Sequence, residues 1–394
     1  MKCKICDSNK ISEVLDLGKQ PLANKYPKSF TQIKNEKKFS LKILFCKNCK
    51  SAQIKKIVDR NILFEDYYYL SSVNKKLRQH FESLSKKVKK YKFIVDIGSN
   101  DGILLKPLKK LKLNAIGIDP SINVGKIAND QGLKTYIGFF DKPIIKKILK
   151  NYPKPDLIVA SSVITHLDNP QKFSKNIKYF LKTGGDVIVE IEYLQNFLKN
   201  LEFERFYFDR PFYYSLNSIN NLFEKNKMSL FDFENIKTHG GSLRCYIKNT
   251  KNQKKSKKLS SALKKEKRIL NQDKLINFAN TIKHYSSDFN LKLKEMSEKN
   301  KFIIGYGCPA RVSTITNLSK INKKYINFII DDSPLKAGRY SPGINIPIKS
   351  FNYLSKRKKY TVIVFAYDYF KDIKQKLKYY KCEFYFPIPI KKIS

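Results

Sequence analysis

Residues 93–102 read Phe-Ile-Val-Asp-Ile-Gly-Ser-Asn-Asp-Gly, an apolar run that leads into a loop of glycine and short polar residues. The apolar run predicts a β-strand, and a helical pattern begins near Ile103, after the loop. Gly98 and Gly102 allow the backbone to adopt positive φ and to approach a ligand closely. The stretch therefore predicts a nucleotide-type ligand site at a strand-to-helix turn.

An acidic residue follows at the distance typical of such sites. Asp119 ends a second strand-like run, residues 115–118, about 20 residues after the glycine turn, where ribose hydroxyls are bound in nucleotide sites of this kind. No Gly-Lys-Ser/Thr sequence follows to hold phosphates and magnesium, so ATP or GTP is not expected. An adenosyl ligand with a cationic sulfonium suits this acidic loop better than a pyrophosphate. A turn without any ligand is the alternative.

The length of 394 residues favours two or three domains. The 79 Lys and Arg against 34 Asp and Glu give a net charge of +45, but the lysines are spread through every segment. We therefore expect solvated basic faces rather than a specific nucleic-acid partner, although a positive field would also attract phosphorylated substrates. No run of 18 apolar residues and no signal-peptide pattern occurs, so the chain is expected in the cytoplasm, away from membranes.

Four of the seven cysteines form two pairs of equal spacing, Cys3-x-x-Cys6 and Cys46-x-x-Cys49. Each pair turns its backbone so that two thiolates face one point, and two pairs supply the four ligands of a tetrahedral zinc site. The surrounding segment of about 55 residues has little hydrophobic core otherwise. We therefore expect a structural Zn²⁺ bound by all four thiolates. Incidental or redox-active cysteines are the alternative.

From Phe93 onward the chain alternates strand-like and helical patterns, which predicts a parallel sheet. Further strands are expected at 156–161 and 185–190, and a helix is expected at 171–181. Ligands bind at the carboxyl ends of such strands, a rule that selects Ser162, His166 and residues 190–193. For His166 this position favours catalysis or substrate contact over capping or packing. The candidate cofactor-binding residues are Asp96, Gly98, Asn100, Gly102, Asp119 and Ser162.

Three successive tyrosines occupy residues 67–69, between the cysteine segment and the glycine loop. They cannot all face one core, so at least one phenol is expected at a ligand or at a domain interface. Interface packing and chemistry are equally compatible with any single one of them.

Two later segments combine aromatic, basic and glycine residues as substrate loops do. Residues 203–214 crowd aromatic side chains around Asp209 and Arg210. Residues 238–244 read Thr-His-Gly-Gly-Ser-Leu-Arg ahead of a short strand, so backbone N–H groups are exposed and Arg244 can form a forked pair with a phosphate or carboxylate. A plain hairpin turn is the alternative for the second segment.

The last third of the chain predicts a helical connector and a second α/β unit. Residues 251–301 are rich in lysine and lack glycine and proline, as expected of a connecting helix. Residues 302–310 give a strand and a glycine turn similar to a dinucleotide fingerprint, but Pro309 interrupts the pattern and makes the case for NAD weak. Two further strands are expected at 328–332 and 360–366, with a basic loop between them at 336–343.

The order of these motifs resembles the sugar C-methyltransferase family, which builds branched deoxysugars on nucleotide diphosphates with S-adenosylmethionine. The resemblance covers nearly the whole chain. It rests on the two cysteine pairs and on five motifs: Tyr-x-Tyr-x-Ser-Ser at 67–72, the glycine loop at 96–102, His-Gly-Gly-Ser-Leu-Arg at 239–244, Gly-Tyr-Gly-x-Pro-Ala at 305–310 and Gly-Arg-Tyr-x-Pro-Gly at 338–343.

The resemblance implies an α/β fold with a class I methyltransferase Rossmann-like domain, a small N-terminal zinc-binding domain and a C-terminal Rossmann-like α/β domain. The expected parts are a zinc-binding domain (1–57), a methyltransferase domain with an N-terminal helical cover (58–250), a helical connector (251–300) and the C-terminal domain (301–394). S-adenosylmethionine would bind the middle domain, and the C-terminal domain would help hold a nucleotide-linked sugar. The oligomeric state stays open.

In that family a base removes the proton α to a sugar ketone, and the carbanion or enolate attacks the sulfonium methyl group. The residues that match catalytic positions are His166, Tyr207, Asp209, Arg210 and Tyr69. The candidate substrate-binding residues are Tyr67, His239, Arg244, Arg339 and Tyr340.

One departure from the family pattern concerns the base. Members usually read Tyr-His-Glu-His, whereas residues 207–210 read Tyr-Phe-Asp-Arg. Arg210 stays protonated and cannot be the base, so either His166 or Asp209 takes this role. Tyr207 is expected to orient the ketone, and Arg210 to bind an anionic group or stabilise the developing oxyanion.

The expected reaction is C-methylation of a nucleotide-linked keto-deoxysugar. The alternatives are O-methylation of a sugar or related metabolite, and a non-catalytic protein that binds a sugar nucleotide or nucleic acid and keeps the fold.

Overall fold

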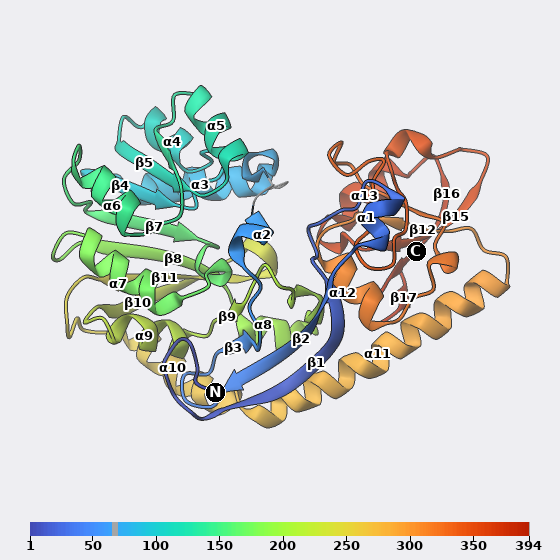
Figure 1. Ribbon diagram of the computed structural model, residues 1–394, viewed down its shortest axis with the longest axis horizontal. Helices are drawn as coiled ribbons and strands as arrows, with labels where there is room; N and C mark the ends of the chain where they lie inside the picture. Colours follow the sequence, from blue (N-terminus) through green and yellow to red (C-terminus); the bar gives the residue numbers. More distant parts are fainter. Residues whose placement is uncertain (65–69, 394) are drawn as a thin grey trace.

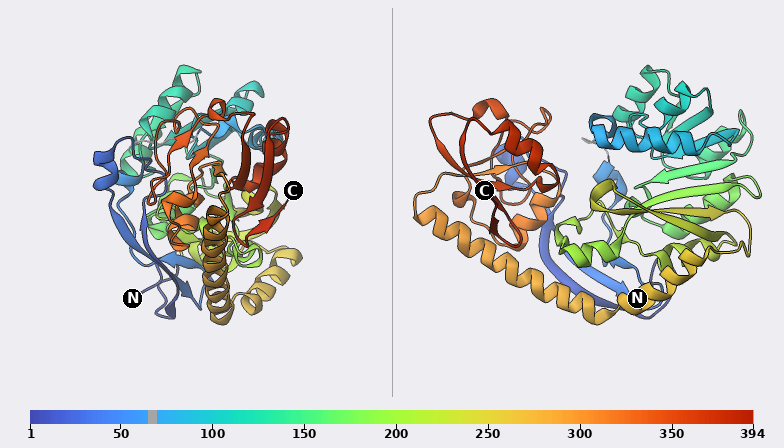
Figure 2. Two further views of the ribbon diagram at one scale, coloured as in Figure 1. Left: turned by 90° about the vertical axis from the view of Figure 1, so that its right-hand side faces the viewer. Right: turned by 180° about the vertical axis from the view of Figure 1, so that it is seen from behind.

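The computed structural model describes residues 1–64 and 70–393. Two α/β domains lie side by side, and a narrow antiparallel sheet and a long helix connect them along one side (Figure 1). Two further views show the same arrangement, with the long helix reaching from one domain to the other (Figure 2). The expected α/β class is confirmed, with a small N-terminal sheet in addition.

The central sheet has seven strands in the order β10-β11-β8-β7-β4-β5-β6. All strands run parallel except β11, which lies antiparallel between β8 and β10. The strands are β4 (Phe93–Ile97), β5 (Asn114–Asp119), β6 (Thr135–Ile137), β7 (Leu157–Ser161), β8 (Asp186–Glu192), β10 (Ser229–Ile236) and β11 (Ser242–Lys248). The chain order reverses at β4 and β7, so a ligand crevice is expected beyond their carboxyl ends.

The strands and the helix predicted between residues 93 and 190 are confirmed by β4, β5, β7, β8 and α7. The prediction of an all-parallel sheet is wrong for one strand, β11. Because β10 and β11 are joined by a short turn, they form a hairpin, and β11 must enter the sheet antiparallel. This turn, residues 237–241, contains the glycine pair at 240–241, so the hairpin alternative holds for that segment.

Helices cover both faces of the central sheet. They are α3 (Lys75–Lys87), α4 (Leu105–Lys110), α5 (Ile122–Asp130), α6 (Lys142–Leu149), α7 (Pro170–Phe180) and α9 (Leu216–Glu224), whereas α8 (Leu194–Asn200) packs in the core that includes the N-terminal sheet. Asn74 caps α3 by accepting from the N–H of Leu77, and the apolar side of this helix packs Phe81 against the sheet. The opposite face packs on α7 and α9, in a core that also contains the cysteines of the N-terminal segment.

The N-terminal sheet joins three parts of the molecule. Its strands are β1 (Ile11–Pro21), β2 (Lys38–Cys46), β3 (Ala52–Ile54) and β9 (Phe212–Tyr213), and its helices are α1 (Phe30–Lys34) and α2 (Arg60–Phe64). The last strand, β9, comes from the domain of the central sheet and pairs with β3. At the other end of the β1–β2 hairpin, the N–H of Tyr340 in the C-terminal domain donates to Pro27 (2.9 Å), and the N–H of Gly343 donates to Glu36 (2.9 Å).

The C-terminal domain contains a six-stranded sheet in the order β14-β13-β12-β15-β16-β17. Its strands are β12 (Ile303–Tyr306), β13 (Phe328–Ile330), β14 (Ile348–Lys349), β15 (Lys359–Val364), β16 (Lys381–Phe386) and β17 (Lys391–Lys392), with helices α12 (Arg311–Leu318) and α13 (Phe370–Lys376). The strands expected near 302, 328 and 360 are confirmed. This sheet also reverses its chain order, at β12 and β15, so a second ligand-type crevice is expected there.

Helices α10 (Lys257–Ile269) and α11 (Gln272–Glu298) lead from one α/β domain to the other. Helix α11 buries one side against the N-terminal sheet and α12, within a single hydrophobic core that includes Leu275, Phe278 and Phe289. The two domains and the N-terminal sheet therefore share a core rather than standing apart.

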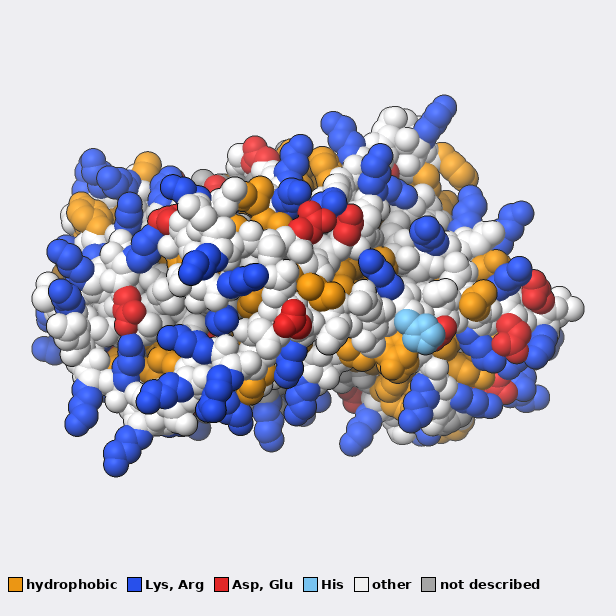
Figure 3. All heavy atoms as spheres, turned by 90° about the horizontal axis from the view of Figure 1, so that it is seen from below, with side chains coloured by type: hydrophobic (Ala, Val, Ile, Leu, Met, Phe, Trp, Pro, Cys, Tyr) orange, Lys and Arg blue, Asp and Glu red, His pale blue; other side chains and the backbone are white. Residues whose placement is uncertain are grey.

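The excess of basic residues is spread over the surface. On the face that contains α11, lysines and arginines are scattered between apolar and acidic side chains and form no separate basic tract (Figure 3). Among the described residues, no helix is long and apolar enough to cross a membrane.

Gly98 offers a test of how tightly the glycine loop packs. It has φ +71°, and a Cβ atom there would lie 2.3 Å from Cγ2 of Val163, whereas Gly18 has φ +72° with nothing within 4 Å. Both substitutions to Ala carry the cost of positive φ, but only Gly98→Ala adds a clash. Gly98→Ala should therefore destabilise the protein by about 1–3 kcal/mol more than Gly18→Ala, measured by urea unfolding. Equal losses would mean that Val163 yields without cost.

Candidate functional site

Asp119 connects the glycine loop to the next strand. Its carboxylate is 5% exposed at the end of β5, where Oδ2 accepts from the N–H of Asn100 (2.9 Å) and Oδ1 from the N–H of Ser121 (2.9 Å). The carboxylate also accepts from the Ser121 side chain and keeps one acceptor direction for a ribose hydroxyl. Burial raises the pKa of Asp119, although the two N–H groups favour the charged form. The arrangement fits the predicted adenosyl ligand.

The polar residues of the loop hold the segment that covers it. Asn100, at φ +50°, accepts from the N–H of Ser71 (2.9 Å), and Asp101 accepts from the hydroxyl and the N–H of Ser72. The short 3-10 helix Ser71–Val73 is thereby fixed over the loop. Tyr67 and Tyr69 lie outside the described residues, so their expected roles stay predictions.

Gly98, Gly102 and Ser162 shape the crevice at the ends of β4 and β7. The space beside Gly98 is filled by Val163, and a Cβ at Gly102 would meet Leu133 at 2.4 Å. Neighbouring side chains therefore add to the positive φ in favouring glycine at both positions, a reason that the sequence does not show. Ser162, at φ +57°, donates its N–H to the carbonyl of Glu190 (2.9 Å).

Three buried acidic residues stand close together in this crevice. Burial and the nearby charges of Asp119 and Glu190 raise the pKa of Asp96 well above its usual range. A cationic sulfonium would offset this concentration of negative charge, whereas a phosphate would add to it. The residues present thus fit S-adenosylmethionine.

Glu190 is the centre of a polar row across the sheet. It accepts from His80 (2.9 Å), from Nε of Arg244 (2.7 Å) and from Ser161 (2.9 Å). Burial opposes its ionisation, but His80 and Arg244 outweigh this and lower its pKa. The loop position expected for Arg244 is wrong, because β11 begins at Ser242 and places Arg244 opposite Glu190. Its substrate contact stays a prediction.

His166 ends the short 3-10 helix Ile164–His166, directly after β7. Its Nδ1 forms a short hydrogen bond with the backbone carbonyl of Asp209. A carbonyl only accepts, so Nδ1 carries the proton and Nε2 is the basic nitrogen of the neutral ring. Asp209 itself is 2% exposed, and burial raises the pKa of its carboxyl group.

Tyr207 and Arg210 stand beside these residues. The guanidinium of Arg210 lies 5.2 Å from the centre of the Tyr207 ring and pairs with Glu192. Burial raises the pKa of Tyr207 to about 12, against the effect of Arg210, so the phenol keeps its proton at neutral pH. The structure thus brings His166, Tyr207, Asp209 and Arg210 together.

The C-terminal domain reaches the same place through the N-terminal sheet. Asn24 donates to the carboxylate of Asp209 (2.6 Å), and Tyr26 donates its hydroxyl to the carbonyl of Cys308 (2.8 Å). Arg339 lies against the carbonyl of Tyr26 (3.4 Å), next to Tyr340, which is bonded through its N–H to the same loop. The side chain of His239 lies outside the described part of the chain. The substrate roles of these residues stay predictions.

The four paired cysteines form one cluster. Their sulfur atoms lie within 4.8 Å of one another, with Cys3 3.7 Å from Cys49 and Cys6 3.6 Å from Cys46. Tetrahedral zinc with bonds of about 2.3 Å requires sulfur separations of about 3.8 Å, so the geometry fits this ion. Four thiolates leave no open position, which makes the site structural.

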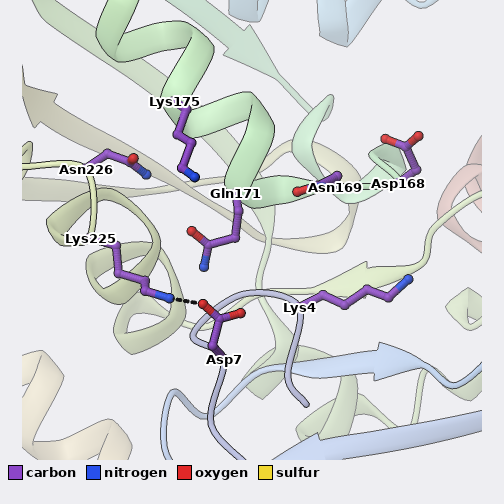
Figure 4. A pocket seen from close by; sticks show the side chains of 8 residues that line it. All are labelled: Lys4, Asp7, Asp168, Asn169, Gln171, Lys175, Lys225 and Asn226. Carbon is purple, nitrogen blue, oxygen red and sulfur yellow. Dashed lines mark hydrogen bonds and ion pairs between the residues drawn. The ribbon is translucent and has the colours of Figure 1, made fainter. Parts of the chain in front are cut away.

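A cavity of about 600 Å³ is lined by the N-terminal segment, the start of α7 and the end of α9. Figure 4 shows lysines at its edges and the ion pair between Lys225 and Asp7. Its lining residues are Lys4, Asp7, Asp168, Asn169, Gln171, Lys175, Lys225 and Asn226. The lining contains none of the predicted site residues.

Comparison with known proteins covers nearly the whole chain. Three family models match in order: "Putative zinc binding domain" over 3–64, "Methyltransferase domain" over 69–230 and "C-methyltransferase C-terminal domain" over 237–389. The C-methyltransferase NovU of Streptomyces niveus is 24% identical over 358 residues, which are 89% of this chain and 85% of that protein.

Other similarities cover less than half of the chain. The ubiquinone biosynthesis O-methyltransferase of Rattus norvegicus is 32% identical over 103 residues, 24% of this chain and 29% of that protein. Among solved structures, PH0226 protein from Pyrococcus horikoshii is 15% identical with a TM-score of 0.38, over 46% of this chain and 94% of that one. The magnesium protoporphyrin IX methyltransferase from Synechocystis is 14% identical with a TM-score of 0.34, over 43% of this chain and 82% of that one.

The fold and the matched middle domain define an S-adenosylmethionine-dependent methyltransferase, with a structural zinc site in its N-terminal segment. The matches to a zinc-binding domain, a methyltransferase domain and a C-methyltransferase C-terminal domain follow one another along the chain, which is similar to a C-methyltransferase over 89% of its length. The resemblance inferred from its motifs is confirmed.

Several residues of the site carry no signal in the sequence. Asn24 and Tyr26 stand in a short loop after β1, and His80 lies in a lysine-rich helix. No motif or spacing marks them, because their partners come from distant segments of the chain.

Zinc content tests the metal site. The wild-type protein should contain one zinc per chain, and Cys46→Ser should lose most of it and several kcal/mol of stability, because the N-terminal segment depends on the metal. Metal analysis and thermal unfolding measure both. Cys382→Ser, a thiol outside the cluster, is the matched control and should retain the zinc. A folded Cys46→Ser protein with full zinc content would contradict the assignment.

Calorimetry tests Asp119. Asp119→Ala should weaken S-adenosylmethionine binding by about 1–3 kcal/mol, the cost of losing a charge-assisted hydrogen-bond acceptor. Asp130→Ala removes the same charge from the exposed end of α5 and should leave the affinity unchanged. An unaltered dissociation constant for Asp119→Ala would show that ribose binds elsewhere.

Proposed function

We propose that this enzyme transfers a methyl group to the carbon next to the ketone of a nucleotide-linked deoxysugar. One observation carries the proposal. A continuous set of contacts runs from His166, at the crevice of the methyltransferase sheet, through Asp209 and Asn24 to Tyr26 and Cys308, at the crevice of the C-terminal sheet. A substrate bound across this junction would present its nucleotide to one domain and its sugar to the other.

The nucleotide half is supported by a repeated local structure. In the C-terminal domain, Asp331 accepts from the N–H of Cys308 (2.6 Å) and of Ser333 (2.9 Å), while Gly307 donates its N–H to Ile330 (2.7 Å). Asp119 makes the same pair of bonds, to the glycine loop and to the residue two positions ahead. In this proposal residues 58–250 bind the cofactor and residues 301–394 help to bind the nucleotide.

The second part of the proposal concerns removal of the proton next to the ketone. His166 is the group that we expect to take the proton α to the ketone, because its Nδ1–H is bound to a carbonyl and its Nε2 is the proton acceptor. The alternative base, Asp209, accepts from Asn24 and is buried, which leaves it poorly placed to meet a substrate.

Tyr207 and Arg210 are expected to stabilise the product of this step. The C–H electron pair moves into the enolate, the proton goes to Nε2 of His166, and negative charge develops on the ketone oxygen. The protonated phenol of Tyr207 can donate to that oxygen, and Arg210 beside it supplies positive charge. S-adenosylmethionine, when bound, supplies an electrophilic methyl group for the nucleophilic carbon.

Solvent exchange tests the proposed carbon chemistry. A panel of nucleoside-diphosphate keto-deoxysugars is incubated with the enzyme and labelled S-adenosylmethionine in deuterated water, and mass spectrometry follows both labels. For the substrate that is methylated, wild-type enzyme should introduce deuterium at the α-carbon. His166→Ala should lose exchange and methyl transfer by about 10²- to 10⁴-fold.

The control is His284→Ala, an exposed histidine on α11, which should behave as wild type. Methyl transfer to a hydroxyl without exchange would support O-methylation instead and leave His166 with a structural role.

A further inference from the structure

We propose that Asn24, from the N-terminal zinc-bearing part of the chain, is a positioning residue of the methyltransferase site. It holds Asp209 in place so that the backbone carbonyl of Asp209 orients the imidazole of His166. The inference rests on the function proposed above, in which His166 is the base.

The first step is the bond between Asn24 and Asp209. Asn24 Nδ2 donates to Oδ2 of Asp209 at 2.6 Å, and the carboxylate is 2% exposed. Its other oxygen is buried with no hydrogen-bond partner among the described residues. Arg210, the adjacent cation, pairs with Glu192 instead. The amide of Asn24 is therefore the side-chain donor that fixes this carboxylate.

The second step is the bond between Asp209 and His166. The carbonyl oxygen of Asp209 accepts from Nδ1 of His166. A histidine whose Nδ1–H is bound to a backbone carbonyl is held in one tautomer and one ring orientation, with Nε2 as the basic nitrogen. Asp209 thus uses both of its polar groups, the carboxylate toward Asn24 and the carbonyl toward His166.

The third step is what holds Asn24 itself. The preceding residue, Ala23, is 1% exposed, and the N–H of Lys25 donates to Leu22 (3.1 Å) to close a turn around Asn24. Tyr26, two residues after Asn24, is 5% exposed and donates its hydroxyl to the carbonyl of Cys308 (2.8 Å). The loop follows β1, which pairs with β2, the strand that ends at the zinc ligand Cys46. The N-terminal hairpin thereby contributes to catalysis by delivering Asn24.

Four variants separate positioning from direct chemistry. Asn24→Ala removes the donor, and Asn24→Asp replaces it with a second carboxylate. Asp209→Asn keeps an oxygen that can accept from Asn24. The double variant Asn24→Asp/Asp209→Asn exchanges donor and acceptor and restores the bond with reversed direction.

With the keto-deoxysugar nucleotide that is methylated, Asn24→Ala and Asn24→Asp should lower kcat about 10- to 100-fold with little change in KM, because the base is misplaced while substrate contacts remain. The double variant should recover most of the kcat that Asn24→Asp loses, because it restores the bond between the two side chains. Activity of Asn24→Asp should also recover in part as the pH falls, because a protonated carboxyl group donates as the amide does. Glu36→Gln, in the same hairpin but away from the site, is the control and should leave activity unchanged.

A second readout needs no substrate. The chain has four histidines, so ¹⁵N-histidine spectra of the full-length protein can be assigned with His166→Gln. Wild-type protein, Asp209→Asn and the double variant should show His166 with the proton on Nδ1. Asn24→Ala and Asn24→Asp should shift the signal toward a tautomer mixture.

The proposal is overturned if Asn24→Ala keeps wild-type kcat and tautomer, or if Asp209→Asn and the double variant are both inactive, which would make Asp209 the base. If the wild-type enzyme methylates no sugar nucleotide, the proposed function fails, while the His166 signal still decides whether Asn24 orients the ring.

Discussion

The structure depends on the pairing of β3 with β9, which ties the N-terminal sheet to the methyltransferase domain. From this point the β1–β2 hairpin extends to the C-terminal domain, and α11 packs along it within one hydrophobic core. The four thiolates fix the near end of the hairpin. The N-terminal segment thus links two large domains, because its apolar side chains contribute to the cores of both.

The two α/β domains share one hydrogen-bonding arrangement at their ligand-type crevices. A carboxylate at the end of the second strand accepts one N–H from the glycine loop and one from the residue two positions ahead, at Asp119 and again at Asp331. The bonds hold the loop against the strand and keep the carboxylate buried. The shared geometry explains why the C-terminal segment resembles a nucleotide fingerprint although Pro309 interrupts the pattern.

The distribution of charge separates the surface from the site. The chain has a net charge of +45, yet the buried titratable residues around the crevices are mainly acidic, with Asp96, Asp119, Glu190 and Asp209 each at most 5% exposed. Lysines remain in water, where their solvation is cheapest. A strongly basic sequence is therefore compatible with an acidic interior suited to a cationic cofactor, and the overall charge does not indicate the ligand.

Sequence alone determined the features that depend on neighbours along the chain. The strand before Gly98, the acidic Asp119 and the two cysteine pairs are local patterns of period, turn chemistry and spacing, and they could be recognised together with the family. The tertiary structure decided the rest. The antiparallel β11 places Arg244 on Glu190, and the bond between Asn24 and Asp209 joins residues 185 positions apart. Such contacts leave no pattern in one sequence, because they arise only when distant segments pack into a common core.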